Sequence, residues 1–141
     1  MDKSRWLVAA CVALALAATA SLAAAASTTT LHATLSGSSE TPKGDPDGKG
    51  NATIRITGTK VCYTFAYSKI DTPNAAHIHK GAKGTAGPVV VPFFMKPHKK
   101  TGCVTVKSSL AKAIASKPGD YYVNLHNAKY PGGAIRGQLH K

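Results

Sequence analysis

Apolar and polar residues alternate with a period of two along most of the chain after residue 27, which predicts a series of short β-strands. We expect strands at residues 30–37, 51–57, 61–67, 75–79, 89–95, 103–106, 120–126 and 134–139. Gly58 and Thr59 separate the second strand from the third and predict a hairpin. Pro92 cannot donate to a strand ladder, so the strand at 89–95 should be an edge or bulged strand.

Helical patterning appears once, at residues 108–116, where Leu110 and Ile114 are four residues apart. Residues 38–50 are rich in Pro, Gly and Asp and predict an exposed loop, and the glycine-rich segment 81–87 predicts a mobile loop. Eight short strands at near-regular spacing favour an all-β fold. We expect a Greek-key antiparallel β-sandwich or flattened barrel with at most one short helix.

The first 26 residues depart from this pattern and are typical of a secretory signal peptide. Basic residues precede an apolar run from Trp6 to Ala18, and small residues with A-x-A cleavage sites follow. The run of about 13 residues is shorter than the roughly 20 that a membrane-spanning helix needs. We predict a signal peptide at 1–26, one domain at 27–141, no transmembrane segment after signal removal, and a secreted location, periplasmic or extracellular.

The charge balance is strongly basic, with 18 Lys and Arg against 6 Asp and Glu in the whole chain. Removing residues 1–26 takes away two basic residues and one acidic residue, which leaves 16 against 5 and a net charge of +11. Only two of the remaining basic residues, Arg55 and Arg136, are arginines, which argues against a nucleic-acid partner. The charge favours an anionic surface polymer or an extracellular protein as partner, or serves solubility alone. The densest basic segment is KPHKK at residues 96–100.

Cysteine usage agrees with export. Cys11 lies in the predicted signal peptide, so Cys62 and Cys103 remain as a single pair in an oxidising compartment. We predict that they form a disulfide, with two free thiols as the alternative. Closing a loop of about 40 residues would contribute roughly 4 kcal/mol to stability in the chain-entropy model.

Four separated segments of the chain resemble the CHRD domain, a module first described in chordin and also found as a stand-alone secreted bacterial protein. They are HxHxG at 77–81, GPVV at 87–90, YYVNxH at 121–126 and PGGxxRGQL at 131–139. The opening LHATLSGSSETP at 31–42 is also similar to the start of that family. The resemblance implies an all-β extracellular domain similar in build to copper/zinc superoxide dismutase. It implies a binding or structural module, at the cell envelope or outside the cell, without an established catalytic activity.

Three histidines are candidate metal ligands. His77 and His79 are two residues apart, so on one strand both side chains leave the same face. His126, on another strand, would supply a third imidazole, and an all-histidine site favours copper. The pattern is similar to that of the superoxide dismutases, in which an arginine near the copper steers an anion. Arg136 holds that place here, and Asn124 shares a strand face with His126.

A structural role for these histidines is the alternative, in which they hydrogen-bond to neighbouring backbone, Arg136 or Asn124 and hold loops together. The dismutase pattern is incomplete, because no cluster of His and Asp lies between Gly81 and Val89 and no fourth copper histidine is evident. Other catalytic patterns are weaker, since the carboxylates are scattered and no GxSxG occurs. We predict no catalytic residues. A copper-binding protein with a metal-handling or dismutase-like redox role is the alternative to a binding module.

Overall fold

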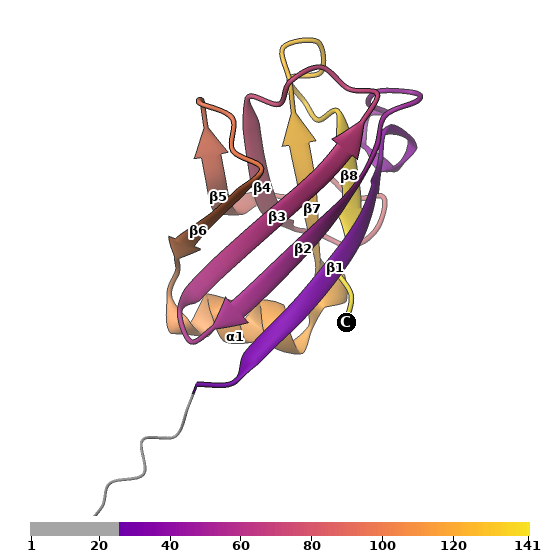
Figure 1. Cartoon of the computed structure of the whole chain (residues 1–141). Coiled ribbons are helices and arrows are strands. Elements are labelled where there is room, and N and C mark those ends of the chain that lie inside the picture. The colour runs from indigo at the N-terminus through magenta and orange to yellow at the C-terminus, as the bar shows by residue number, and fades with distance from the viewer. Residues whose placement is uncertain (1–25) are drawn as a thin grey trace, which may run out of the picture.

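The computed structural model describes residues 26–141, which form an eight-stranded antiparallel sheet curled into a nearly closed, flattened barrel (Figure 1). The strands are β1 (Thr28–Ser36), β2 (Lys49–Thr57), β3 (Lys60–Ser68), β4 (Ala75–Lys80), β5 (Val89–Met95), β6 (Thr101–Thr105), β7 (Tyr121–His126) and β8 (Ile135–Gln138). One α-helix, α1 (Ser108–Ser116), and two short 3-10 helices, η1 (Gly37–Ser39) and η2 (Pro118–Asp120), join them. The predicted fold class, the eight strands and the single short helix are confirmed. The predicted signal peptide lies outside the described residues, apart from its last residue.

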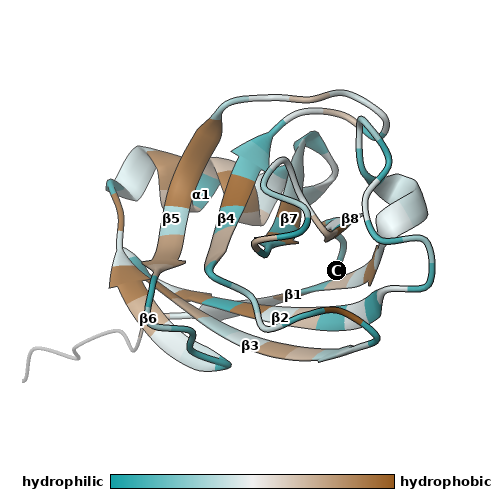
Figure 2. Ribbon diagram, turned by 90° about the horizontal axis from the view of Figure 1, so that it is seen from above, coloured by the Kyte–Doolittle hydropathy of each residue, from teal (hydrophilic) through white to brown (hydrophobic). Residues whose placement is uncertain are grey.

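The strand order around the barrel is β5-β4-β7-β8-β1-β2-β3-β6. Several neighbours are therefore far apart in the sequence, as in a Greek key. Figure 2 shows the two layers: β5, β4, β7 and β8 lie on one side, and β1, β2, β3 and β6 on the other. The two ends of this order, β5 and β6, are the edges that meet at the seam of the barrel.

The core fills the space between the two layers. Period-two alternation sends one set of side chains inward from every strand, and α1 adds Ala111 and Ile114 at one end of the barrel (Figure 1). The largest fully buried apolar side chains are Leu31, Leu35, Ile54, Ile78, Ile114, Leu125, Ile135 and Leu139. Within residues 26–141, no helix combines the length and the apolar character needed to cross a membrane.

Two local predictions on the strands are confirmed. The strand containing Pro92 is an edge strand, and its pairing with β4 shifts register on both sides of His77 and Ile78. The missing N–H of Pro92 accounts for this placement. Cys62 and Cys103 lie directly opposite each other on β3 and β6 and form the predicted disulfide across 41 residues of sequence.

The loop between β1 and β2 is exposed over much of its length, as predicted, but two of its carboxylates are buried. Glu40 and Asp45 are each 5% exposed. The Asp45 backbone donates to the carbonyl of Ala134 at 2.9 Å, and Gly44 packs against the same carbonyl too closely to admit a Cβ. The composition of the loop identified its turns but not this long-range packing, which buries two carboxylates.

Candidate metal centre

The pairing of β4 with β7 brings the three predicted histidines together. His77 and His79 leave the outer side of β4, because Ala76 and Ile78 between and beside them point into the core. His126 is the last residue of β7 and pairs with Ala75 of β4. One ring nitrogen from each histidine lies within 4.8 Å of the others. The geometry therefore presents three imidazoles to one point outside the barrel wall.

Two backbone carbonyls fix the orientation and the tautomer of two rings. His126 Nδ1 donates to the carbonyl of Pro131 at 2.9 Å, and His79 Nδ1 donates to the carbonyl of Gly87 at 2.8 Å. A carbonyl oxygen only accepts, so these nitrogens carry the proton and each Nε2 keeps its lone pair. Such outer contacts are what orient histidine ligands at metal sites.

The third ring completes the cluster through a direct contact. His77 Nδ1 lies 3.1 Å from His126 Nε2, and since the latter holds a free lone pair, His77 Nδ1–H is the donor in the neutral cluster. A bound cation would replace this shared proton, because both nitrogens would then offer lone pairs to it. The cluster thus holds either a proton or a metal ion between these two rings.

His79 is the most enclosed of the three. Its side chain is 9% exposed, and its ring stacks on Tyr122 at 4.8 Å between ring centres with 7° between the planes. Its Nε2 is buried and has no hydrogen-bond partner among residues 26–141. A buried nitrogen without a partner costs roughly 1–3 kcal/mol of desolvation, which a ligand at that position would recover.

The environment disfavours protonation of the cluster. Burial, followed by the neighbouring His126 and His79, lowers the pKa of His77 from 6.5 to about 4. Burial also lowers the pKa of His126, although its hydrogen bond to the Pro131 carbonyl acts in the opposite direction. Neutral imidazoles are the form that binds metal ions, so the site is poised for coordination at neutral pH.

Arg136 of β8 is separated from the two histidines of β4 by β7 and is 3% exposed. Its Nε donates to the Ser39 carbonyl at 2.7 Å, its Nη1 to the Thr85 carbonyl at 3.1 Å, and its Nη2 to Thr41 Oγ1 at 3.0 Å. Its guanidinium carbon also lies 4.2 Å from the centre of the Tyr122 ring. Because these contacts direct the guanidinium toward protein groups, they support a bracing role for Arg136. Anion steering by this residue stays a prediction.

Asn124 occupies the position between the histidines and Arg136. On β7 it lies opposite His77 of β4 on one side and opposite Arg136 of β8 on the other. Its side chain is buried, and its Oδ1 has no hydrogen-bond partner among the described residues. Asn124 therefore lies between the histidine cluster and Arg136 in the sheet.

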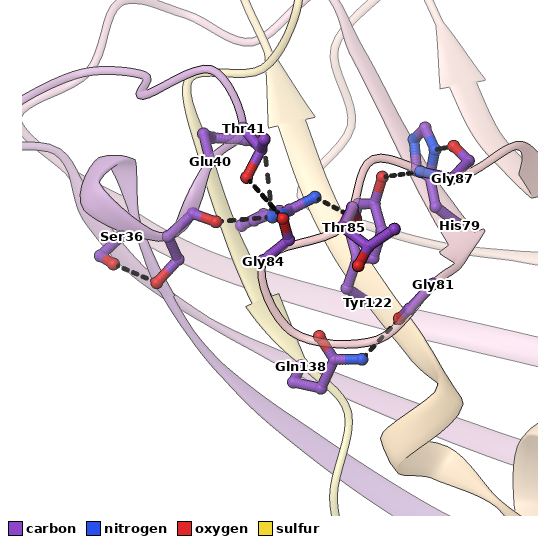
Figure 3. A network of polar contacts seen from close by, with 12 residues as sticks. Ser36, Glu40, Thr41, His79, Gly81, Gly84, Thr85, Gly87, Tyr122 and Gln138 are labelled. Atoms are coloured by element: carbon purple, nitrogen blue, oxygen red, sulfur yellow. Dashed lines mark hydrogen bonds and ion pairs between the residues drawn. The ribbon is translucent and has the colours of Figure 1, made fainter.

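The glycine-rich loop 81–88 covers this side of β7. Polar side chains of neighbouring segments form hydrogen bonds with this loop, as Figure 3 shows for Thr41, His79, Tyr122 and Gln138. Arg136 also bonds to it, through the Thr85 carbonyl. Gly87 also packs so tightly on the Lys80 carbonyl that a Cβ there would overlap it. Two of these side chains, Arg136 and His79, are buried and donate to the carbonyls of Thr85 and Gly87 in the loop. The expectation of a mobile loop stays a prediction.

Glu40 is the residue of this region that the sequence did not single out. It lies 3.8 Å from Arg136 Nε, and Gly133 provides the room for its carboxylate. Burial raises its pKa from 4.5 to about 7, although Arg136, Asn124 and the Thr41 backbone act in the opposite direction. The only available signal was its place in the segment LHATLSGSSETP, which resembles the start of a known family.

The remaining histidines of the described chain are not part of the cluster. His98 bonds to the Tyr67 hydroxyl at 2.9 Å, and His32 and His140 lie near each other at 6.2 Å between ring centres. The donor set is thus three imidazoles. Two nitrogens bound to one ion at about 2.0–2.1 Å lie at most about 4.2 Å apart, so small ring rotations would bring this trio into range. The residues present fit a borderline metal such as copper, and copper binding stays a prediction.

Comparison with known proteins identifies the family. A family model described as CHRD domain matches residues 31–139, nearly the whole described chain. The resemblance predicted from the four sequence segments is therefore confirmed. No curated protein and no solved structure matches the chain. The family and the disulfide together fit a binding or structural module of an extracellular kind.

Proposed function

We propose that this chain, which belongs to the CHRD domain family, is a binding and structural module that acts at the cell envelope or outside the cell. Its partner is an anionic surface polymer, held by lysines that a rigid barrel displays. The disulfide between β3 and β6 supports this role, because oxidised cysteine pairs persist outside the cytoplasm.

The distribution of charge carries the proposal. Every lysine of residues 26–141 is exposed. Of the five carboxylates in this range, Glu40 and Asp45 are buried, which leaves Asp47, Asp71 and Asp120 at the surface. Positive charge therefore outweighs negative charge more strongly on the exposed surface than the net charge of the chain indicates. A surface of this kind attracts polyanions over several ångströms, and added salt weakens that attraction.

The basic loop 96–100 is anchored to aromatic side chains of the barrel. His98 bonds to the Tyr67 hydroxyl, and Lys100 Nζ lies 5.3 Å from the centre of the same ring. Phe94 also contacts the His98 ring, with 5.7 Å between ring centres. Fixing the loop in this way reduces the entropy lost when its lysines bind a partner.

A salt titration tests this proposal. Binding of residues 27–141 to an immobilised anionic polysaccharide should weaken steadily as ionic strength rises, and a neutral polysaccharide should not bind. Replacing Lys96, Lys99 and Lys100 with Gln should weaken binding more than the matched replacement of Lys107, Lys112 and Lys117. Affinity that does not change with salt would exclude charge as its basis and favour a protein partner.

We propose copper binding as a second function, because one observation favours it specifically. Three imidazole nitrogens lie within 4.8 Å of one another, and the Nε2 of His79 is buried without a partner. His77 through Nδ1, and His79 and His126 through Nε2, would hold the ion. Bound copper would supply Lewis acidity or one-electron chemistry, whereas the protein orients the ligands through Gly87 and Pro131. A metal-handling role needs only this binding, and a dismutase-like role needs turnover as well.

Elemental analysis of protein isolated from the periplasm or medium tests the second function. We expect about one copper for each chain. Because burial lowers the pKa of His77 to about 4 and also lowers that of His126, binding should persist below pH 6.5 and weaken as pH falls toward 4. Replacing His77 and His126 with Ala should abolish binding and leave the far-ultraviolet circular dichroism unchanged. Replacing the exposed His140 with Ala is the matched control. Full copper binding by the double variant would assign these histidines a structural role.

A further inference from the structure

The seam of the barrel, where the edge strands β5 and β6 meet, contains a cavity of about 340 Å³. Aromatic side chains from β5 and from β3, the neighbour of β6, line it: Phe93 and Phe94 of β5 and Tyr63 of β3. The Tyr63 ring centre lies 4.6 Å from that of Phe93 and 6.2 Å from that of Phe94. These packed rings close the seam on its inner side and form the floor of the cavity.

Two features of the rim complete the site. Met95 follows the aromatic pair and is 68% exposed, the most exposed large apolar side chain of the described chain. Lys96 and Lys99 line the same cavity, and no carboxylate does. An apolar floor with an uncompensated cationic rim fits a ligand that carries both an apolar chain and a negative charge.

We propose that this seam binds a single-chain anionic amphiphile, such as a fatty-acid carboxylate. Its chain lies on Phe93, Phe94 and Met95, and its carboxylate pairs with Lys96 and Lys99. The volume is near the lower end of the roughly 300–1,000 Å³ typical of small-molecule sites, which suits a short acyl chain. The inference goes beyond the proposed polymer binding, because it requires the apolar part of the ligand and a defined stoichiometry.

Isothermal titration calorimetry with decanoate, below its micelle concentration, tests the site. Decanoate should bind residues 27–141 with a stoichiometry of one, whereas decanol should bind at least tenfold more weakly and acetate should not bind. Replacing Lys96 and Lys99 with Gln should lower the affinity for decanoate by about tenfold and leave that for decanol unchanged. Equal affinity for decanoate and decanol, or several equivalent sites, would overturn the proposal.

Two substitutions separate the cavity from the surrounding charge. Met95→Glu places a carboxylate at the rim on an exposed side chain, so the barrel should fold and decanoate binding should be lost. Val89→Glu, at the other end of β5 and 46% exposed, is the matched control and should bind like the parent. Undiminished binding by Met95→Glu would refute the location.

Gly102→Val tests the cavity in a second way, because a Cβ at this position would lie 2.5 Å from the Tyr63 hydroxyl. The Tyr63 ring, which lines the cavity, would have to move, and decanoate binding should weaken. Binding of anionic lipid vesicles without binding of decanoate would assign the seam to a membrane surface and overturn the proposal. Polymer binding measured in parallel distinguishes the two functions, since Met95→Glu leaves the lysines in place.

Discussion

The buried carboxylate Glu40 gives the sharpest test of the energetics around the histidine cluster. Its side chain is 2% exposed and faces Arg136, yet burial raises its pKa from 4.5 to about 7. The folded state therefore keeps the proton that the unfolded state releases above pH 4.5. The free energy of unfolding should fall as pH rises from 4.5 to about 7, because the unfolded chain binds fewer protons over this interval.

The size of the effect follows from the pKa difference. At roughly 1.4 kcal/mol for each pH unit, a pKa raised from 4.5 to about 7 corresponds to about 3 kcal/mol of stability lost above pH 7. Glu40→Gln keeps the shape and the polarity of the side chain but cannot ionise. The difference in unfolding free energy between variant and parent should therefore change by about 3 kcal/mol, in favour of the variant, between pH 4 and pH 8.

Urea unfolding of residues 27–141 at intervals of pH, followed by circular dichroism, measures this difference. Other titrating groups, including His77, contribute equally to both proteins and cancel. The comparison at pH 4 is the internal control, because the carboxyl is then protonated in the parent. A difference that does not change with pH would refute the argument. If the parent instead becomes the more stable protein as pH rises, the ion pair with Arg136 affects the pKa of Glu40 more than burial does.

Three further predictions concern the disulfide, the loop and the histidines. Replacing Cys62 and Cys103 with Ser should lower the free energy of unfolding by about 4 kcal/mol, and an unchanged urea midpoint would contradict this. Gly87→Ala should loosen loop 81–88, because its Cβ would overlap the Lys80 carbonyl; hydrogen exchange should speed up there and stay slow in β2. Because the pKa of His77 is lowered from 6.5 to about 4, its stabilising contribution is complete above pH 6.5 and is lost as pH falls toward 4. An NMR titration of its ring protons with a midpoint near 6.5 would refute that assignment.

The patterns that the sequence could resolve are local. Period-two alternation and runs of β-branched and aromatic residues identified the eight strands, and the spacing of Leu110 and Ile114 identified α1. The same period places His77 and His79 on one face, since Cβ atoms alternate between the two sides of a strand. Pro92 limited its strand to an edge because a missing N–H is a property of one residue. One cysteine pair outside the predicted signal peptide left a single possible bridge.

The tertiary structure decided what depends on residues far apart in the chain. Arg136 reaches the carbonyl of Ser39 across 97 positions, and no pattern within a window of sequence contains that contact. The strand order places β4 beside β7, which turns a pair of histidines into a trio. The backbone carbonyls of Gly87 and Pro131 fix the tautomers of the His79 and His126 rings. Because every residue type carries a backbone carbonyl, the sequence does not reveal which ones accept these bonds. Burial of Glu40 likewise depends on which segments pack over it, and burial is the largest cause of its raised pKa.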